Sequence, residues 1–135
     1  MGAFSVVISQ ASQKPIYLQI EEQVISLIVS GSLSEGEELP SIRNLARDLR
    51  ISVITTKRAY DDLEASGFVT TVAGKGTYVS VRNREFFREQ KLRQIEGRLE
   101  EAVGEAQAIG MSLEEMIASL TLLYGGRTDG HGSEG

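Results

Sequence analysis

The chain has 135 residues, of which 41% are hydrophobic and 24% are charged, as in one modest soluble domain or a small domain with an appendage. It has no cysteine, which excludes disulfides and thiolate metal sites and favours a reducing cytoplasm as its location, and no apolar run approaches the roughly 20 residues that span a bilayer. The net charge of −5 argues at first sight against a nucleic-acid partner.

The first helix is predicted to begin near Pro15, because proline is favoured in the first turn of a helix. Residues 1–13 before it are expected to form a weakly structured lead-in segment. The apolar residues that recur at helical spacing are Ile16, Ile20, Val24, Leu27 and Ile28. Gly31 is a suitable C-terminal stop, and the stretch 31–36 reads as a loop.

Two short amphipathic helices joined by a tight turn are predicted over residues 41–49 and 52–66. Ser41 and Ser52 are suited to cap them, because a serine side chain accepts a hydrogen bond from a free N–H of the first turn. The positions expected to be buried in whole or in part are Ile42, Leu45, Ala46, Leu49, Ile54, Ala59 and Leu63. Gly67 is expected to end the second helix of the pair.

A small β-hairpin is predicted over residues 68–80, with its tip at Gly74-Lys75-Gly76. The two glycines allow the positive φ that a sharp tip requires. A phosphate-binding loop is excluded, because Val69 stands where such a loop needs its first glycine and Gly76 stands where it needs serine or threonine.

Two further helices are predicted towards the end of the chain, one over 83–109 and one that begins with the capping box at Ser112 and ends before Gly125-Gly126. Residues 126–135 are polar and glycine-rich, and we expect them to be disordered. The apolar side chains that form a stripe along the two helices are Leu92, Ile95, Leu99, Val103, Leu113, Met116, Ile117 and Leu120. Because one such helix pair cannot bury its own stripe, we expect it to pair with a second copy in an isologous homodimer.

The charges are unevenly distributed along the chain. Residues 38–82 carry seven basic and five acidic groups, whereas residues 83–135 carry six basic and ten acidic groups. At cellular salt, charges are screened over about 8 Å, so a local basic face can bind DNA although the chain as a whole is acidic. The helix pair and hairpin therefore remain candidates for DNA contact.

Three motifs in this order resemble the DNA reader of GntR-type bacterial repressors. They are Leu39-Pro40-Ser41-x-Arg43-x-Leu45-Ala46, then Ser52…Thr55…Lys57-Arg58-Ala59-Tyr60…Leu63-Glu64…Gly67, then Gly74-Lys75-Gly76-Thr77-Tyr78-Val79. The resemblance implies a mainly α fold with a small β-hairpin: an N-terminal winged helix-turn-helix domain over 14–81 and a C-terminal two-helix dimerisation region over 82–125. The short appendage is similar to the YtrA-like branch, which implies a repressor of its own operon or of a transporter operon, with an effector that is often undefined.

In such a fold the second helix of the pair lies in the DNA major groove and the hairpin tip reaches the minor groove. The candidate DNA-binding residues are Ser41, Arg43, Ser52, Val53, Thr55, Thr56, Lys57, Arg58, Lys75, Gly76 and Thr77. The resemblance assigns an operator contact to Arg43, whose alternative is an ordinary solvated arginine. Where Val53 stands, the family more often has a polar or basic residue, so Val53 is either a contact to a thymine methyl or a tolerated apolar surface residue.

An enzyme is not expected, because the single histidine, His131, lies in the predicted tail and the carboxylates spread along a solvated helix face. No cofactor and no metal site is predicted. A winged-helix adaptor that binds proteins instead of DNA remains the alternative, since a fold does not by itself determine function. The expected partners are a double-stranded DNA operator and a second copy of the chain. Whether a small molecule also binds as an effector is left open. The sequence does not distinguish repression from activation.

Overall fold

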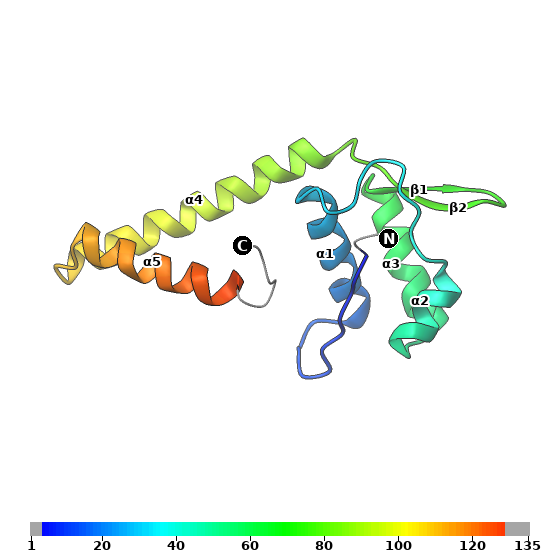
Figure 1. Ribbon diagram of the computed structural model, residues 1–135, viewed down its shortest axis with the longest axis horizontal. Coiled ribbons are helices and arrows are strands. Elements are labelled where there is room, and N and C mark those ends of the chain that lie inside the picture. Colours follow the sequence, from blue (N-terminus) through cyan, green and yellow to red (C-terminus); the bar gives the residue numbers. More distant parts are fainter. Residues whose placement is uncertain (1–3, 129–135) are drawn as a thin grey trace. The chain divides into compact units, whose positions relative to one another are not determined.

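The computed structural model describes residues 4–128. Its elements, in chain order, are α1 (Ile16–Val29), α2 (Ile42–Leu49), α3 (Val53–Ala65), β1 (Val69–Val72), β2 (Gly76–Val79), α4 (Arg84–Ala108) and α5 (Leu113–Thr128) (Figure 1). The chain divides into two units, Met1–Gln90 and Lys91–Gly135. The predicted fold class, mainly helical with one two-stranded hairpin, is confirmed.

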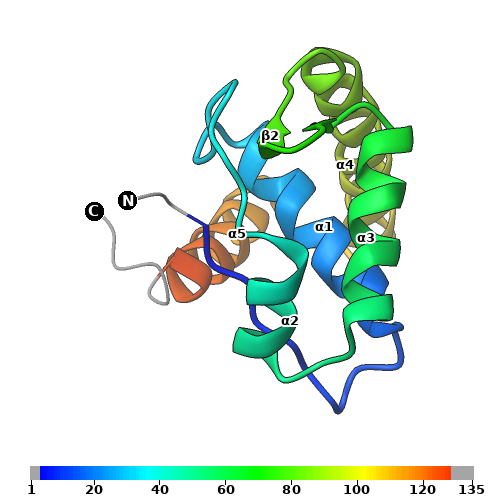
Figure 2. The ribbon, with the colours of Figure 1, turned by 90° about the vertical axis from the view of Figure 1, so that its right-hand side faces the viewer.

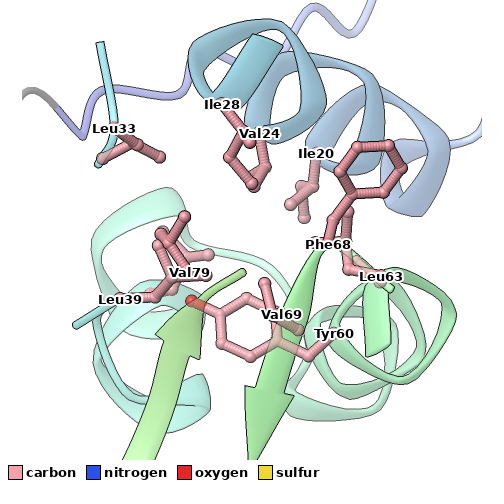
Figure 3. Packing of buried hydrophobic residues seen from close by; sticks show 12 residues of the cluster. Ile20, Val24, Ile28, Leu33, Leu39, Tyr60, Leu63, Phe68, Val69 and Val79 are labelled. Carbon is pink, nitrogen blue, oxygen red and sulfur yellow. The ribbon is translucent and has the colours of Figure 1, made fainter. Parts of the chain in front are cut away.

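The core of the first unit lies between α1, α3 and the hairpin. Apolar side chains that recur along α1 meet side chains of α3 and the two strands (Figure 3). The core residues are Ile20, Val24, Ile28, Leu33, Leu39, Leu45, Ala59, Tyr60, Leu63, Phe68, Val69 and Val79. Burying each large apolar side chain contributes about 1.5–3 kcal/mol, so this cluster holds the helices in place.

The turn between α2 and α3 has the predicted caps. Oγ of Ser41 accepts a hydrogen bond of 3.0 Å from the N–H of Asn44, and Oγ of Ser52 accepts one of 3.0 Å from the N–H of Thr55. Between them, Arg50 adopts a left-handed conformation with φ of 59°, and the N–H of Ile51 bonds to the carbonyl of Ala46 at 3.0 Å. This left-handed residue ends α2 sharply and lets α3 begin at once.

The residues just before α2 run alongside β2 of the hairpin, an arrangement that was not predicted from the sequence. β1 and β2 pair antiparallel, with Val69 opposite Val79, and the chain before α2 adds a bridge between Glu38 and Tyr78. The N–H of Leu39 donates to the carbonyl of Thr77 at 2.9 Å. The start of α2 is therefore attached directly to the base of the hairpin.

The lead-in segment is more ordered than expected where the structure describes it. Two glutamines of α1, Gln19 and Gln23, each bond to the backbone of the extended residues 7–9 through both atoms of their amides, at 2.7–3.1 Å. Phe4, Val6 and Ile8 pack against the core. Residues 4–9 thus form no helix or strand, but the side-chain amides of α1 hold residues 7 and 9 by pairing with their backbone groups.

The second unit contains most of α4, from Lys91 onwards, and all of α5. The predicted capping box is present: Oγ of Ser112 accepts from the N–H of Glu115 at 3.1 Å, and the Glu115 carboxylate accepts from the N–H of Ser112 at 2.8 Å. Helix α5 does not end before Gly125-Gly126 as predicted but continues to Thr128, because glycine weakens a helix by only about 1 kcal/mol and does not by itself end one. The rest of the predicted tail, 129–135, lies outside the described residues.

The division between the two units falls within α4, after Gln90. The first turns of α4 belong to the first unit, where the ring of Phe87 packs edge-on against that of Phe68 with centroids 5.0 Å apart. This aromatic contact anchors the beginning of α4 to the core.

Candidate nucleic-acid interface

The candidate interface consists of the start of α2, the first turn of α3 and the tip of the hairpin. In Figure 1, α1 lies on one side of α3, whereas α2 and the hairpin tip lie on the other side; Figure 2 looks onto that side. The core beneath and the link between Leu39 and β2 hold these three parts together. All three belong to the first unit, so their arrangement does not depend on the second.

Arg43 and Lys75 are exposed cations at two ends of this surface. Arg43 is the second residue of α2, two residues after the Ser41 cap, and Lys75 lies at the hairpin tip. Within residues 4–128, neither side chain takes part in a hydrogen bond or an ion pair. Both are thus free to meet the phosphates or base edges of a duplex.

A backbone hydrogen bond and two glycines with positive φ shape the tip of the hairpin. The N–H of Lys75 donates to the carbonyl of Val72 at 2.9 Å, and the flanking Gly74 and Gly76 have φ of 75° and 146°. A Cβ at Gly76 would lie 2.7 Å from the carboxylate of Glu38, a flexible side chain that can move aside, so it is the positive φ that favours glycine at this position. Gly76 therefore shapes the tip, and its neighbour Thr77 belongs to β2, where its carbonyl accepts from Leu39.

The hydroxyl groups at the start of α3 are already engaged with one another. Oγ of Ser52 accepts from the N–H of Thr55 and donates to Oγ1 of Thr55 at 2.9 Å. Ser41 has the same capping role on α2. These residues lie on the candidate surface, and in the free protein their side chains cap the two helices.

Two predictions about α3 are wrong. Thr56, a candidate for DNA contact, is fully buried, and its hydroxyl donates to the carbonyl of Ser52 at 3.0 Å. Ile54, expected in the core, is 81% exposed. Counting helical phase from the Ser52 cap explains both results, because Thr56 lies on the same face as the buried Ala59, Tyr60 and Leu63, and Ile54 lies on the opposite face.

The two basic residues of α3 carry ion pairs with aspartates one turn later. Nζ of Lys57 lies 2.8 Å from the carboxylate of Asp61, and Nε of Arg58 lies 3.7 Å from that of Asp62. Exposed pairs of this kind contribute about 0–1 kcal/mol, so a DNA phosphate can replace the aspartate. The guanidinium of Arg58 also lies 3.8 Å above the ring of Tyr17, which ties it to α1.

A pair of carboxyl groups lies behind Arg58. Burial, and then a hydrogen bond to Asp62 and the charge of Asp62, raises the pKa of Glu21 from 4.5 to about 7, while the charge of Arg58 acts in the opposite direction. Oε2 of Glu21 is buried, and no described residue donates to it when both carboxyl groups are ionised. The raised pKa favours the protonated form of Glu21, which can donate a hydrogen bond to Asp62.

Arg50 is a further exposed cation on this side of the molecule, in the turn between α2 and α3, and none of the sequence motifs pointed to it. Its left-handed conformation is uncommon for a residue other than glycine or asparagine, and no sequence signal pointed to it.

Among the described residues, no helix has the length and apolar character to cross a bilayer, and no group of three or more metal-ligating side chains comes together.

Comparisons with known proteins agree with this geometry. Residues 16–79 match the family of bacterial regulatory proteins named gntR. The HTH-type transcriptional repressor YtrA of Bacillus subtilis is 34% identical to the chain over 109 residues, which are 81% of this chain and 84% of that protein.

Solved structures agree with the fold. A GntR family transcriptional regulator from Listeria monocytogenes superposes with a TM-score of 0.61 at 33% identity, covering 84% of this chain and 97% of that one. The DNA-binding domain of AraR in complex with its operator ORX1 superposes with a TM-score of 0.51 at 26% identity, covering 56% of this chain and 95% of that one.

Proposed function

The chain belongs to the gntR family of bacterial regulatory proteins, and from this membership we propose that it binds a palindromic operator as a homodimer and represses transcription. Members of this family are DNA-binding transcriptional regulators and not enzymes. The adaptor alternative raised from the sequence is therefore set aside. The observation that carries the proposal is the surface formed by α2, the first turn of α3 and the hairpin tip, which leaves Arg43 and Lys75 unpaired.

In the proposed complex the first turn of α3 enters the major groove and the hairpin tip reaches the adjacent minor groove. Arg43 then contacts a phosphate or a guanine edge, and Lys75 enters the narrow groove because its two glycine neighbours add no bulk. Ser52, Val53, Thr55 and Lys57 complete the proposed contacts of α3. Arg58 approaches a phosphate from the flank of α3, after it exchanges Asp62 for the DNA.

A homodimer is supported by the apolar side chains of the second unit. The stripe along α4 and α5 stays exposed in the single chain, with Leu99 at 48% and Leu120 at 52%. The two helices do not pack closely on each other, and an apolar groove of about 600 Å³ runs between them, lined by residues such as Val103, Ile109 and Ile117. Helices of a second copy would fill this groove and bury the stripe.

Dimerisation also serves DNA binding. A two-fold dimer presents two α3 helices to the two halves of a palindrome, and the second half then binds at a high effective concentration. The proposed dimerisation residues are those predicted from the sequence: Leu92, Ile95, Leu99, Val103, Leu113, Met116, Ile117 and Leu120.

Repression is supported by the similarity to a protein named as a transcriptional repressor. We place the target in the chain's own operon or in a transporter operon, as the resemblance of its short C-terminal region implies. A small-molecule effector is left open.

Selection of DNA fragments tests this function. Purified protein is mixed with sheared DNA of the source genome, and bound fragments are recovered and sequenced. We expect a shared palindromic site upstream of a small set of genes, bound by wild type and lost or weakened in the Arg43→Ala variant. Recovery of random fragments, equal for both proteins, would contradict sequence-specific binding.

A further inference from the structure

The first turn of α3 presents two branched aliphatic side chains to solvent. Val53 is 50% exposed and Ile54 is 81% exposed, and they follow directly after the Ser52 cap. Nine residues, or about two and a half helical turns, separate Ile54 from the buried Leu63, so the two lie on opposite faces of α3. Ile54 shares its face with Lys57, three residues later, which carries a cation suited to phosphate.

In the free protein, the hydroxyl groups of the same turn already take part in hydrogen bonds of the helix cap. Oγ of Ser52 donates a hydrogen bond of 2.9 Å to Oγ1 of Thr55. The same Oγ accepts a hydrogen bond from the N–H of Thr55. The hydroxyl of Thr56 is buried and donates to the backbone. Val53 and Ile54, the side chains of this turn that form no hydrogen bond in the free protein, are aliphatic, so they can meet a base only through apolar contact.

The largest apolar group on the floor of the major groove is the C5-methyl of thymine; cytosine has only a hydrogen at this position, and the remaining groups at the base edges are mainly hydrogen-bond donors and acceptors. An aliphatic side chain placed against a donor or acceptor removes water from it without replacing the bond, which is unfavourable. Against a methyl group, the same side chain buries apolar surface on both partners, which is favourable.

We infer that Val53 and Ile54 determine operator specificity by packing against the C5-methyl groups of thymines in each half-site. This inference rests on the proposed placement of α3 in the major groove. In this inference the first turn of α3 recognises thymine by its methyl group. The contacts of Arg43 and Lys75 do not distinguish thymine in this way. The operator half-site should contain at least one thymine at the position that α3 covers.

Deoxyuridine tests this inference, because it lacks the methyl group of thymine and keeps the same hydrogen-bonding edge. Each thymine of the selected operator is replaced in turn, and binding is measured by fluorescence anisotropy for wild type, Val53→Ala and Ile54→Ala. We expect one or two positions in each half-site where the replacement weakens wild-type binding about fourfold, the effect of burying roughly one methyl group. At those positions the replacement should have little further effect on the matching alanine variant, as a double-mutant cycle requires for interacting groups.

Val7→Ala is the matched control, because Val7 is also an apolar side chain with 72% exposure but lies outside α3. It should keep the full sensitivity to deoxyuridine. Circular dichroism of Val53→Ala and Ile54→Ala should show unchanged helix content, because both side chains are exposed and alanine favours helix.

The possible failures can be told apart. If no operator is selected, the proposed function fails. If an operator is bound but tolerates deoxyuridine at every thymine, or if Val53→Ala and Ile54→Ala keep the sensitivity of wild type, the methyl readout is wrong while the DNA-binding function stands.

Discussion

The hydroxyl of Tyr60 in α3 donates a hydrogen bond of 2.7 Å to the main-chain carbonyl of Pro40, which lies immediately before the Ser41 cap of α2. Burial raises the pKa of Tyr60 far above its usual value, so the hydroxyl remains protonated and continues to donate. This bond joins the middle of α3 to the start of α2. It therefore sets how Arg43 is placed relative to the first turn of α3.

Tyr60→Phe should destabilise the protein by about 1–2 kcal/mol, because it removes a buried hydrogen bond and leaves the Pro40 carbonyl without a donor. Urea unfolding followed by circular dichroism measures the change. Tyr124→Phe is the control, since Tyr124 is exposed and removal of its hydroxyl should leave the midpoint unchanged. Equal stability of Tyr60→Phe and wild type would mean that this bond does not hold α2 in place.

Arg43→Ala and Lys75→Ala should weaken operator binding in different ways. Loss of a base-edge contact by Arg43 should cost about 1–3 kcal/mol and relax specificity at one base pair. Loss of the Lys75 cation from the minor groove should lower the slope of log K against log salt by about one, because one fewer counterion is released. Binding isotherms at three salt concentrations measure both quantities. Lys91→Ala, in the second unit, serves as the control for a lost lysine. An unchanged slope and affinity for Lys75→Ala would remove the hairpin tip from the interface.

Leu99→Glu combined with Leu120→Glu should convert a dimer into a monomer, because charges would then stand in the middle of the apolar stripe and would lose hydration on association. Sedimentation velocity measures the mass, and operator affinity should fall with it. Leu122→Glu is a matched control. Leu122 is 78% exposed and lies two residues along α5 from Leu120, so it points to a different face of the helix. If the double variant stays dimeric, the subunits meet elsewhere.

Stability should fall as pH rises from 5 to 8, because of Glu21. Its pKa of about 7 in the folded protein is raised above the ordinary 4.5, so the folded state holds a proton that the unfolded state has released in this range. This contribution is complete below the ordinary pKa and is lost as pH rises through 7. Solvent screens part of the interaction, and we expect a loss of about 1–2 kcal/mol.

Glu21→Gln tests the assignment, since its amide can donate to Asp62 at every pH. Urea unfolding at pH 5.5 and pH 8 should show a smaller difference in this variant than in wild type. Glu22→Gln, which alters an exposed ion pair with Lys14, should follow the wild-type profile. A profile for Glu21→Gln that runs parallel to that of wild type would assign the pH dependence to another group.

Local signals in the sequence determined most of the secondary structure. Ser41, Ser52 and Ser112 each cap a helix where the sequence placed a cap, and Gly74 and Gly76 form the hairpin tip. These features depend on neighbours within about four residues, so the chain itself contains the information. The motifs of residues 39–79 likewise indicated the family, because the order and spacing of their residues are properties of the sequence itself.

Tertiary structure alone decided which side of each element meets solvent. The exposure of Ile54 and the burial of Thr56 depend on where α1 covers α3, and apolar character by itself did not reveal that side. The docking of residues 4–9 on Gln19 and Gln23, the bond from Tyr60 to Pro40 and the carboxyl pair of Glu21 and Asp62 join residues far apart in sequence. Such contacts form only after the chain has folded, because each needs two surfaces that the core brings together.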